Sequence, residues 1–219
     1  MKATVSDTRA NARFAGFPAE AFEFFEQLAK HNERAWLQEQ KERYERACRE
    51  PMLQLITELG GDVTKSHVTR LNRDTRFSRN KAPYRTYIAA GVKGNYISLS
   101  ATGLFVGTGF YKPEAAVLGR FRDAVDDKAS GLRLERIVDS LRARGYDVDT
   151  HERLKSAPRG YAADHPRIEL LRMKDLYGGK TFQREPWLST RKALQRIQKT
   201  IDDISPLADW VHAYVEPLR

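Results

Sequence analysis

The chain has 219 residues, of which 41% are hydrophobic and 31% are charged, as is typical of a globular protein with one sizeable core or two small ones. No apolar run approaches the roughly 20 residues that cross a bilayer, and the polar N-terminus lacks the apolar core of a secretory signal. Because Cys48 is the only cysteine, no intramolecular disulfide can form, and we predict a cytoplasmic protein with no membrane partner.

The first 60 residues predict helices that follow a frayed terminus at residues 1–13. From Pro18, apolar residues recur on one helical face, and Asn32 is placed to cap a second helix. We expect Pro51 to end or kink that second helix, and Gly60-Gly61 to stop the last helical turns.

The middle of the chain predicts strands. We expect a strand, a loop, a second strand, a hairpin turn and a third strand that alternates polar and apolar residues, closed by Gly107-Thr108-Gly109. In order, these elements are Val68–Asp74, Thr75–Pro83, Tyr84–Val92, Lys93–Asn95 and Tyr96–Val106.

The last third returns to helical patterns. We expect a helix from Pro113, another that stops at Gly145, a short strand near Ile168–Leu171, a Gly-Gly turn within Leu176–Phe182, and a long helix from Ser189 that Pro206 interrupts. The fold class is therefore α+β, with a central antiparallel sheet flanked by several helices in a single compact domain at residues 14–219.

Positive charge is concentrated in one segment. The chain carries a formal charge of +9, and Asp74 is the only acid between Lys65 and Lys93 among eight basic residues. Such a cluster repels itself unless an anion or other acceptor offsets it. We therefore predict an anion site whose donors are Arg73, Arg76, Lys81 and Arg85, with hydroxyl groups from Tyr84 and Tyr87.

Two readings of this cluster stay open. Asp74 can orient an arginine, act as an acid or base, or ligate a metal, and it is the only residue that we name as a candidate for catalysis. The alternative is an internal Arg–Asp network that fixes the loop without any ligand.

Other motifs are weaker. The backbone at Gly107 and Gly109, before the helix at Pro113, can cradle an anion or form a tight turn. Asp147, Asp149 and His151 alternate as metal ligands can, but a solvated acidic turn fits them better. Asp164-His165, one acid beside one histidine, is weak evidence for acid–base catalysis. No zinc or serine-hydrolase signature occurs, so we predict no metal site and name no cofactor.

The cluster carries a family resemblance. Residues 73–85, Arg-Asp-Thr-Arg-Phe-Ser-Arg-Asn-Lys-Ala-Pro-Tyr-Arg, resemble the hallmark of the uncharacterised domain of unknown function 2461, and Asn32-Glu33-Arg34-Ala35-Trp36-Leu37 resembles its opening. Gly107–Gly109 resembles its glycine-rich turn, and Arg122 its following helix arginine. Asn80 departs from the usual Asp. The resemblance covers nearly the whole chain and implies no activity.

Three functions follow in order of preference. The first is binding of a phosphate- or carboxylate-bearing small molecule, with or without catalysis. The second is nucleic-acid binding, because Phe77, Tyr84 and Tyr87 interleave with basic residues as stacking platforms do. The third is a structural or protein-interaction role. The sequence leaves the oligomeric state open.

Overall fold

The computed structural model describes residues 13–64, 68–76 and 80–215. The predictions made for residues 1–12, Lys65, Phe77 and Arg79 lie outside these ranges. The chain divides into two compact units, which are described separately: residues 1–106 with 181–199, and residues 107–180 with 200–219. The single domain predicted over residues 14–219 stays a prediction.

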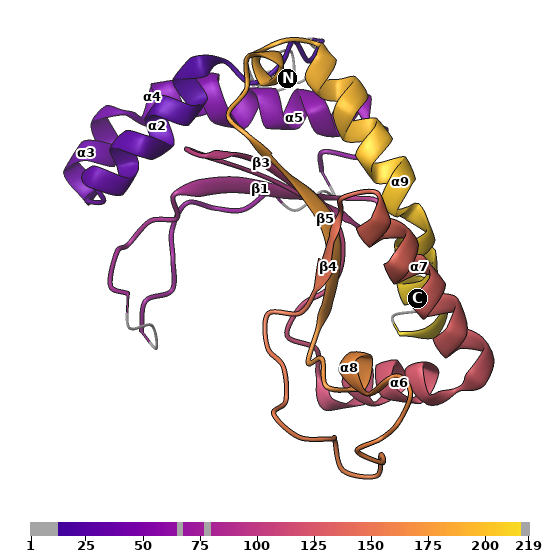
Figure 1. Ribbon diagram of the computed structural model, residues 1–219. Coiled ribbons are helices and arrows are strands. Elements are labelled where there is room, and N and C mark those ends of the chain that lie inside the picture. The colour runs from indigo at the N-terminus through magenta and orange to yellow at the C-terminus, as the bar shows by residue number, and fades with distance from the viewer. Residues whose placement is uncertain (1–12, 65–67, 77–79, 216–219) are drawn as a thin grey trace. The chain divides into compact units, whose positions relative to one another are not determined.

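The α+β class is confirmed (Figure 1). An antiparallel sheet has the strand order β1-β2-β3-β5-β4, and helices account for most of the remaining regular structure. The strands are β1 (Tyr87–Val92), β2 (Asn95–Ser100), β3 (Gly103–Phe110), β4 (Asp147–Asp149) and β5 (Leu176–Gln183). The α-helices are α2 (Ala19–Lys30), α3 (Arg34–Glu39), α4 (Lys41–Tyr44), α5 (Glu50–Glu58), α6 (Ala115–Asp126), α7 (Lys128–Ala143), α8 (Ile168–Leu171) and α9 (Lys192–Tyr214).

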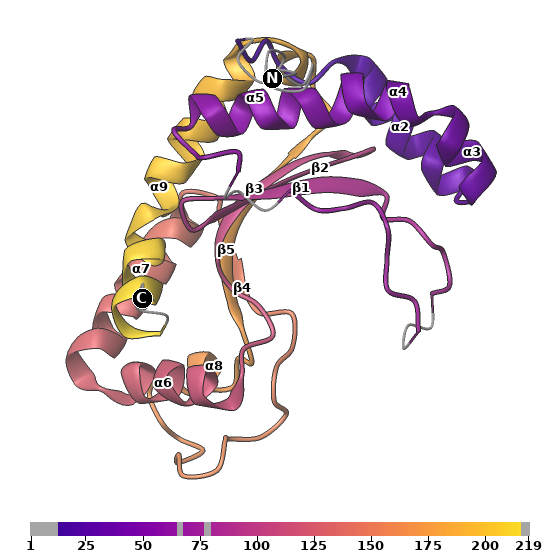
Figure 2. The same cartoon turned by 180° about the vertical axis from the view of Figure 1, so that it is seen from behind.

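In the first unit, helices α2 and α5 cover one face of the β1–β2 hairpin. Both views show the two helices on the same side of these strands (Figures 1 and 2). The covered face is apolar: Ile88, Ala90, Ile97 and Leu99 are at most 1% exposed. Lys93 and Gly94 take positive φ angles between the strands, which is the type I′ geometry that the predicted hairpin turn requires.

Pro51 does not end the helical run, so the part of the prediction that ended the helix there was wrong. It lies in the first turn of α5, directly after the π-helical turn η1 (Glu45–Arg49). There the N–H of Glu50 donates to Glu45 O, five residues back. A π-turn widens the helix, which relieves the clash of a proline ring with the preceding turn.

The second unit has its own core around the fully buried Trp210, whose indole N–H donates to Ser130 O at 2.9 Å. Residues of α6, α7, α8, β4 and α9 pack together there, among them Phe121, Leu134, Val148 and Leu171. None of the helices in the described ranges is long and apolar enough to span a membrane.

Glycines account for two of the misplaced strand boundaries. Gly107–Gly109 lies inside β3 and does not close the strand. At Gly109 the backbone of β3 approaches Leu176 O of β5 so closely that a Cβ would lie 2.0 Å from that oxygen, and only glycine allows this approach. The predicted third strand is instead two strands, separated by a turn at residues 101–102.

Three further predictions were wrong. Gly178-Gly179 continues β5 and forms no turn, since a Cβ on Gly178 would lie 2.3 Å from Leu207 Cδ2. Residues 168–171 form helix α8 and no strand. Pro206 lies inside α9 without interrupting it.

Candidate functional site

The predicted anion site is an exposed arm of the first unit. We name residues 68–76 and 80–86 the basic ribbon, which extends away from α2 and α5 at the end of β1 (Figure 1). Its two arms run antiparallel but form only isolated bridges, Val68 with Ala90 and Asn72 with Tyr84. The strand predicted over Val68–Asp74 is therefore absent as a continuous element.

Backbone and side-chain hydrogen bonds fix the ribbon. Arg73 N donates to Pro83 O at 2.8 Å, and Arg85 N donates to Leu71 O at 2.7 Å. The guanidinium of Arg85 reaches across the arms and donates from Nη1 to Arg70 O at 2.8 Å and to Asn72 O. Arg85 is thus part of the ribbon's own framework.

Asn32 anchors the ribbon at its base. Its Nδ2 donates to Tyr84 O at 3.0 Å, and its Oδ1 accepts from Tyr84 N at 2.9 Å, as a neighbouring strand would do. The expectation that Asn32 caps a helix was wrong, because Glu33 holds the N-cap position of α3. The Tyr84 ring is 8% exposed, so it packs inward and offers no open hydroxyl or stacking face.

The single acid of the ribbon pairs with one arginine. Asp74 Oδ2 accepts from Arg76 Nη2 at 2.7 Å, and Asp74 Oδ1 accepts from Arg76 N at 3.1 Å. These bonds lower the pKa of Asp74, which keeps the carboxylate ionised and makes it a weaker proton acceptor.

Two other ribbon cations contact carbonyl groups. Lys81 Nζ donates to Thr75 O at 3.1 Å, and Arg85 donates to carbonyl oxygens. Within the described residues, neither Lys81 nor Arg85 forms an ion pair with a carboxylate. The structure thus shows the predicted Arg–Asp pairing between Arg76 and Asp74, while the charges of Lys81 and Arg85 are not offset by an acid in the described residues.

The other predicted ligand residues belong to the second unit and make contacts there. Gly109 packs against the backbone of Leu176 and Tyr177, and Arg122 Nε donates to Leu171 O at 3.4 Å. Gly107 lies within β3.

Aromatic side chains lie beside the ribbon on the face of the hairpin opposite to α2 and α5. Tyr96 is 41% exposed, and its ring lies 6.3 Å from that of Phe105. Burial and the neighbouring Tyr87 raise the pKa of Tyr96, while Arg85 opposes the rise, so these side chains lie close together. Of the two aromatics proposed for stacking that the structure describes, Tyr87 is part of this face and Tyr84 is not.

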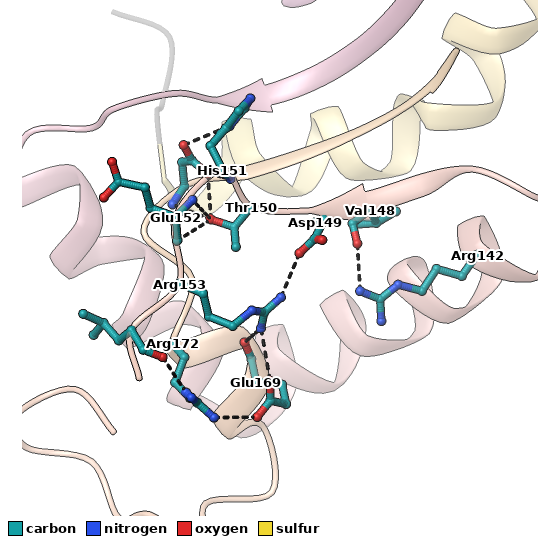
Figure 3. A network of polar contacts seen from close by, with 11 residues as sticks. Arg142, Val148, Asp149, Thr150, His151, Glu152, Arg153, Glu169 and Arg172 are labelled. Atoms are coloured by element: carbon teal, nitrogen blue, oxygen red, sulfur yellow. Dashed lines mark hydrogen bonds and ion pairs between the residues drawn. The ribbon is translucent and has the colours of Figure 1, made fainter. Parts of the chain in front are cut away.

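A second polar site, in the second unit, was not predicted. Asp175 is only 3% exposed, and its Oδ1 accepts from Thr150 Oγ1 and from His151 N, both at 2.7 Å. Its Oδ2 lies 3.0 Å from His151 Nδ1. Figure 3 shows His151 and Thr150 beside a separate group of contacts, in which Arg153 contacts Asp149 and Glu169, and Glu169 contacts Arg172.

This pair escapes sequence reasoning because 24 residues separate Asp175 from His151. The alternating Asp147, Asp149 and His151 pointed to the segment, but Asp149 pairs with Arg153 at 2.8 Å and takes no part in the histidine contact. Within residues 13–64, 68–76 and 80–215, no group of three or more His, Cys, Asp or Glu side chains can hold a metal ion.

The other candidate histidine has no available nitrogen. His165 Nδ1 accepts from Arg167 N at 3.0 Å, and its Nε2 lies 3.1 Å from Asp126 Oδ1. Since both ring nitrogens are engaged, His165 fixes the loop before α8.

A family model described as "Conserved hypothetical protein (DUF2461)" matches residues 20–210. No curated protein matches the chain.

Proposed function

Since the chain belongs to the DUF2461 family of conserved hypothetical proteins, whose description carries no activity, we propose from its own geometry that the basic ribbon binds a phosphate- or carboxylate-bearing ligand. One observation carries this proposal. Lys81 and Arg85 donate to carbonyl oxygens and, within the described residues, form no ion pair with a carboxylate, so the charge of these two side chains is available to an anion.

The fixed backbone supports binding. Arg85 holds the two arms together and Asn32 anchors one of them at Tyr84, so Arg76 and Lys81 belong to a framework that is ordered before the ligand arrives. Pre-ordering lowers the entropic cost of binding. In this proposal Asp74 holds the Arg76 guanidinium in position.

The test is a thermal-shift titration with inorganic phosphate and with citrate, against sodium chloride at equal ionic strength. A ligand that binds only the folded state raises Tm with concentration. We expect wild type to show this rise and R73A/K81A to lose most of it. The control R133A removes an exposed cation of α7, in the other unit, and is expected to respond as wild type does. An undiminished rise in R73A/K81A would refute the proposal.

A second candidate function, binding of single-stranded nucleic acid, is favoured by the aromatic face. Tyr96 and Phe105 lie on an exposed sheet surface next to Arg85, which is the arrangement that stacks bases and contacts phosphates.

Titrations with single-stranded and duplex oligonucleotides at two salt concentrations test this candidate. We expect tighter single-strand binding, a steep loss with salt, and a further loss of roughly 5–150-fold in Y96A, as removal of one stacking ring costs about 1–3 kcal/mol. Y111A, which removes an even more exposed tyrosine of the second unit, is the control. Flat titrations remove the candidate.

A further inference from the structure

We propose that His151, oriented by Asp175, is the proton acceptor of a second site that acts on uncharged acyl compounds. Neither the family match nor the basic ribbon assigns any role to these residues.

The hydrogen bonds decide which nitrogen can accept a proton. Asp175 is a nearly buried carboxylate that accepts from the backbone N–H of His151, and so its other oxygen is placed to accept from Nδ1–H. A neutral imidazole that donates from Nδ1 carries its lone pair on Nε2. In the part of the chain that the structure describes, Nε2 has no hydrogen-bond partner, and the side chain is 52% exposed.

The contrast with His165 is direct. Each histidine lies about 3 Å from a carboxylate, but His165 also accepts a backbone N–H and so has no open nitrogen. Of these two histidines, only His151 combines an orienting carboxylate with an unoccupied ring nitrogen, which is the arrangement that general-base catalysis uses.

The surroundings favour an uncharged substrate. Lys174 is paired with Glu152 at 2.9 Å, so it does not offer its full charge to an anion. Burial raises the pKa of Tyr177, and the negative charges of Asp149, Asp147 and Asp175 add to the rise. The carboxylate of Asp175, whose Oδ2 lies 3.0 Å from His151 Nδ1, would repel an anion placed at this ring, which lies 4.9 Å from the ring of Tyr177.

An aromatic wall is available for a flat substrate group. The ring of Tyr111, which is 61% exposed, lies 4.8 Å from the His151 ring in an edge arrangement, and Lys112 Nζ lies 5.2 Å from the Tyr111 centroid. Gly109 allows β3 to approach β5 closely and so brings Tyr111 beside the histidine.

The step we propose is hydrolysis. Nε2 takes a proton from water as the water oxygen adds to the acyl carbon, the bond from that carbon to the leaving oxygen breaks, and the proton passes to the leaving group or to solvent. One ester and one water give one acid and one alcohol, and no other reactant is needed.

The probe is p-nitrophenyl acetate with the full chain. We expect H151Q to lose about tenfold or more of the wild-type rate, since a positioned general base contributes at least that much. The control is H31Q, because His31 is also exposed and lies against an aromatic ring, that of Trp36, but has no carboxylate on its ring in the described residues. Hydrolysis by H151Q at the wild-type rate would overturn the proposal.

Asp175 is a positioning residue, and its test is the split between kcat and KM. We expect D175N to lower kcat with little change in KM, because the amide no longer fixes which ring nitrogen of His151 carries the proton. Because D175N can fail to fold, ¹⁵N NMR of the wild type gives an independent reading. A neutral His151 with its proton on Nδ1 is the expected result, and a proton on Nε2 would also overturn the proposal.

Discussion

The side chain of Asn32 forms the pair of hydrogen bonds that a neighbouring strand would otherwise form with Tyr84. Its amide pairs with both the N–H and the C=O of Tyr84, in a part-buried position. Asn32→Ala leaves both groups without partners, and we expect a loss of about 1–3 kcal/mol in the free energy of unfolding, measured in urea. The control, Asn80→Ala, removes an exposed bond to Ala82 N that water can replace, and is expected to cost less. Equal losses would contradict this reading.

Glu58 makes stability depend on pH. Its Oε1 accepts from Phe14 N at 2.6 Å and from Arg191 Nη1 at 2.9 Å, and the bond to Arg191 is the main cause of its lowered pKa. Because the folded pKa lies below the unfolded value, the stabilisation is present above the unfolded pKa and is lost as pH falls through the folded pKa.

We therefore expect Glu58→Gln to lower the unfolding free energy at neutral pH, and the difference from wild type to shrink as Glu58 becomes protonated in acid. Denaturant titrations of both proteins at several pH values measure this. A difference that stays constant with pH would mean that the charge of Glu58 contributes nothing.

At the scale of whole elements, helix α9 continues through Pro206 because a neighbouring side chain replaces the hydrogen bond that the proline cannot form. Pro206 has no N–H for Asp202 O, and Ser205 Oγ donates to that carbonyl at 3.0 Å instead. Ser205→Ala is expected to cost about 0.5–1.5 kcal/mol in wild type and less in a Pro206→Ala background, where a backbone N–H is restored. Additive costs in this double-mutant cycle would show that the hydroxyl does not compensate for the proline.

Elements with local causes were predictable from the sequence. The apolar period of α2 and the Lys93-Gly94 turn need only neighbouring residues, and both are confirmed. Two of the errors arose at Gly109 and Gly178, where glycine serves a close approach by β5 or α9 far along the chain. A single sequence shows the glycine but not the segment that approaches it.

The two candidate sites also differ in how far they depend on residues that are distant in the sequence. The basic ribbon was visible because its charges are consecutive in sequence, although the roles of Arg85 and Asn32 depend on contacts across the arms. His151 and Asp175 come into contact because β4 pairs with β5, and no local sequence pattern predicts that pairing. The cytoplasmic location also stays a prediction.

For the whole molecule, the open question is whether the two compact units unfold together. The strands β3 and β5 and the helix α9 each have residues in both units, so loss of either unit disrupts elements of the other. We therefore expect one cooperative transition, in agreement with the predicted single domain.

The three tryptophans allow a direct measurement. Trp36 and Trp187 belong to the first unit and Trp210 to the second, so W36F/W187F leaves fluorescence that reports the second unit alone. Its unfolding curve is expected to coincide with that from far-UV circular dichroism. Two separate midpoints would show two domains.

Cys48 lies on the π-helical turn η1, fully buried, with its Sγ 3.9 Å from Ala21 O of α2. Burial also raises the pKa of its thiol, so the sulfur is both covered and protonated in the folded chain. A disulfide reagent can therefore modify it only during moments when α2 separates from η1. The speed of that modification reports how often the helical layer opens, without any introduced label.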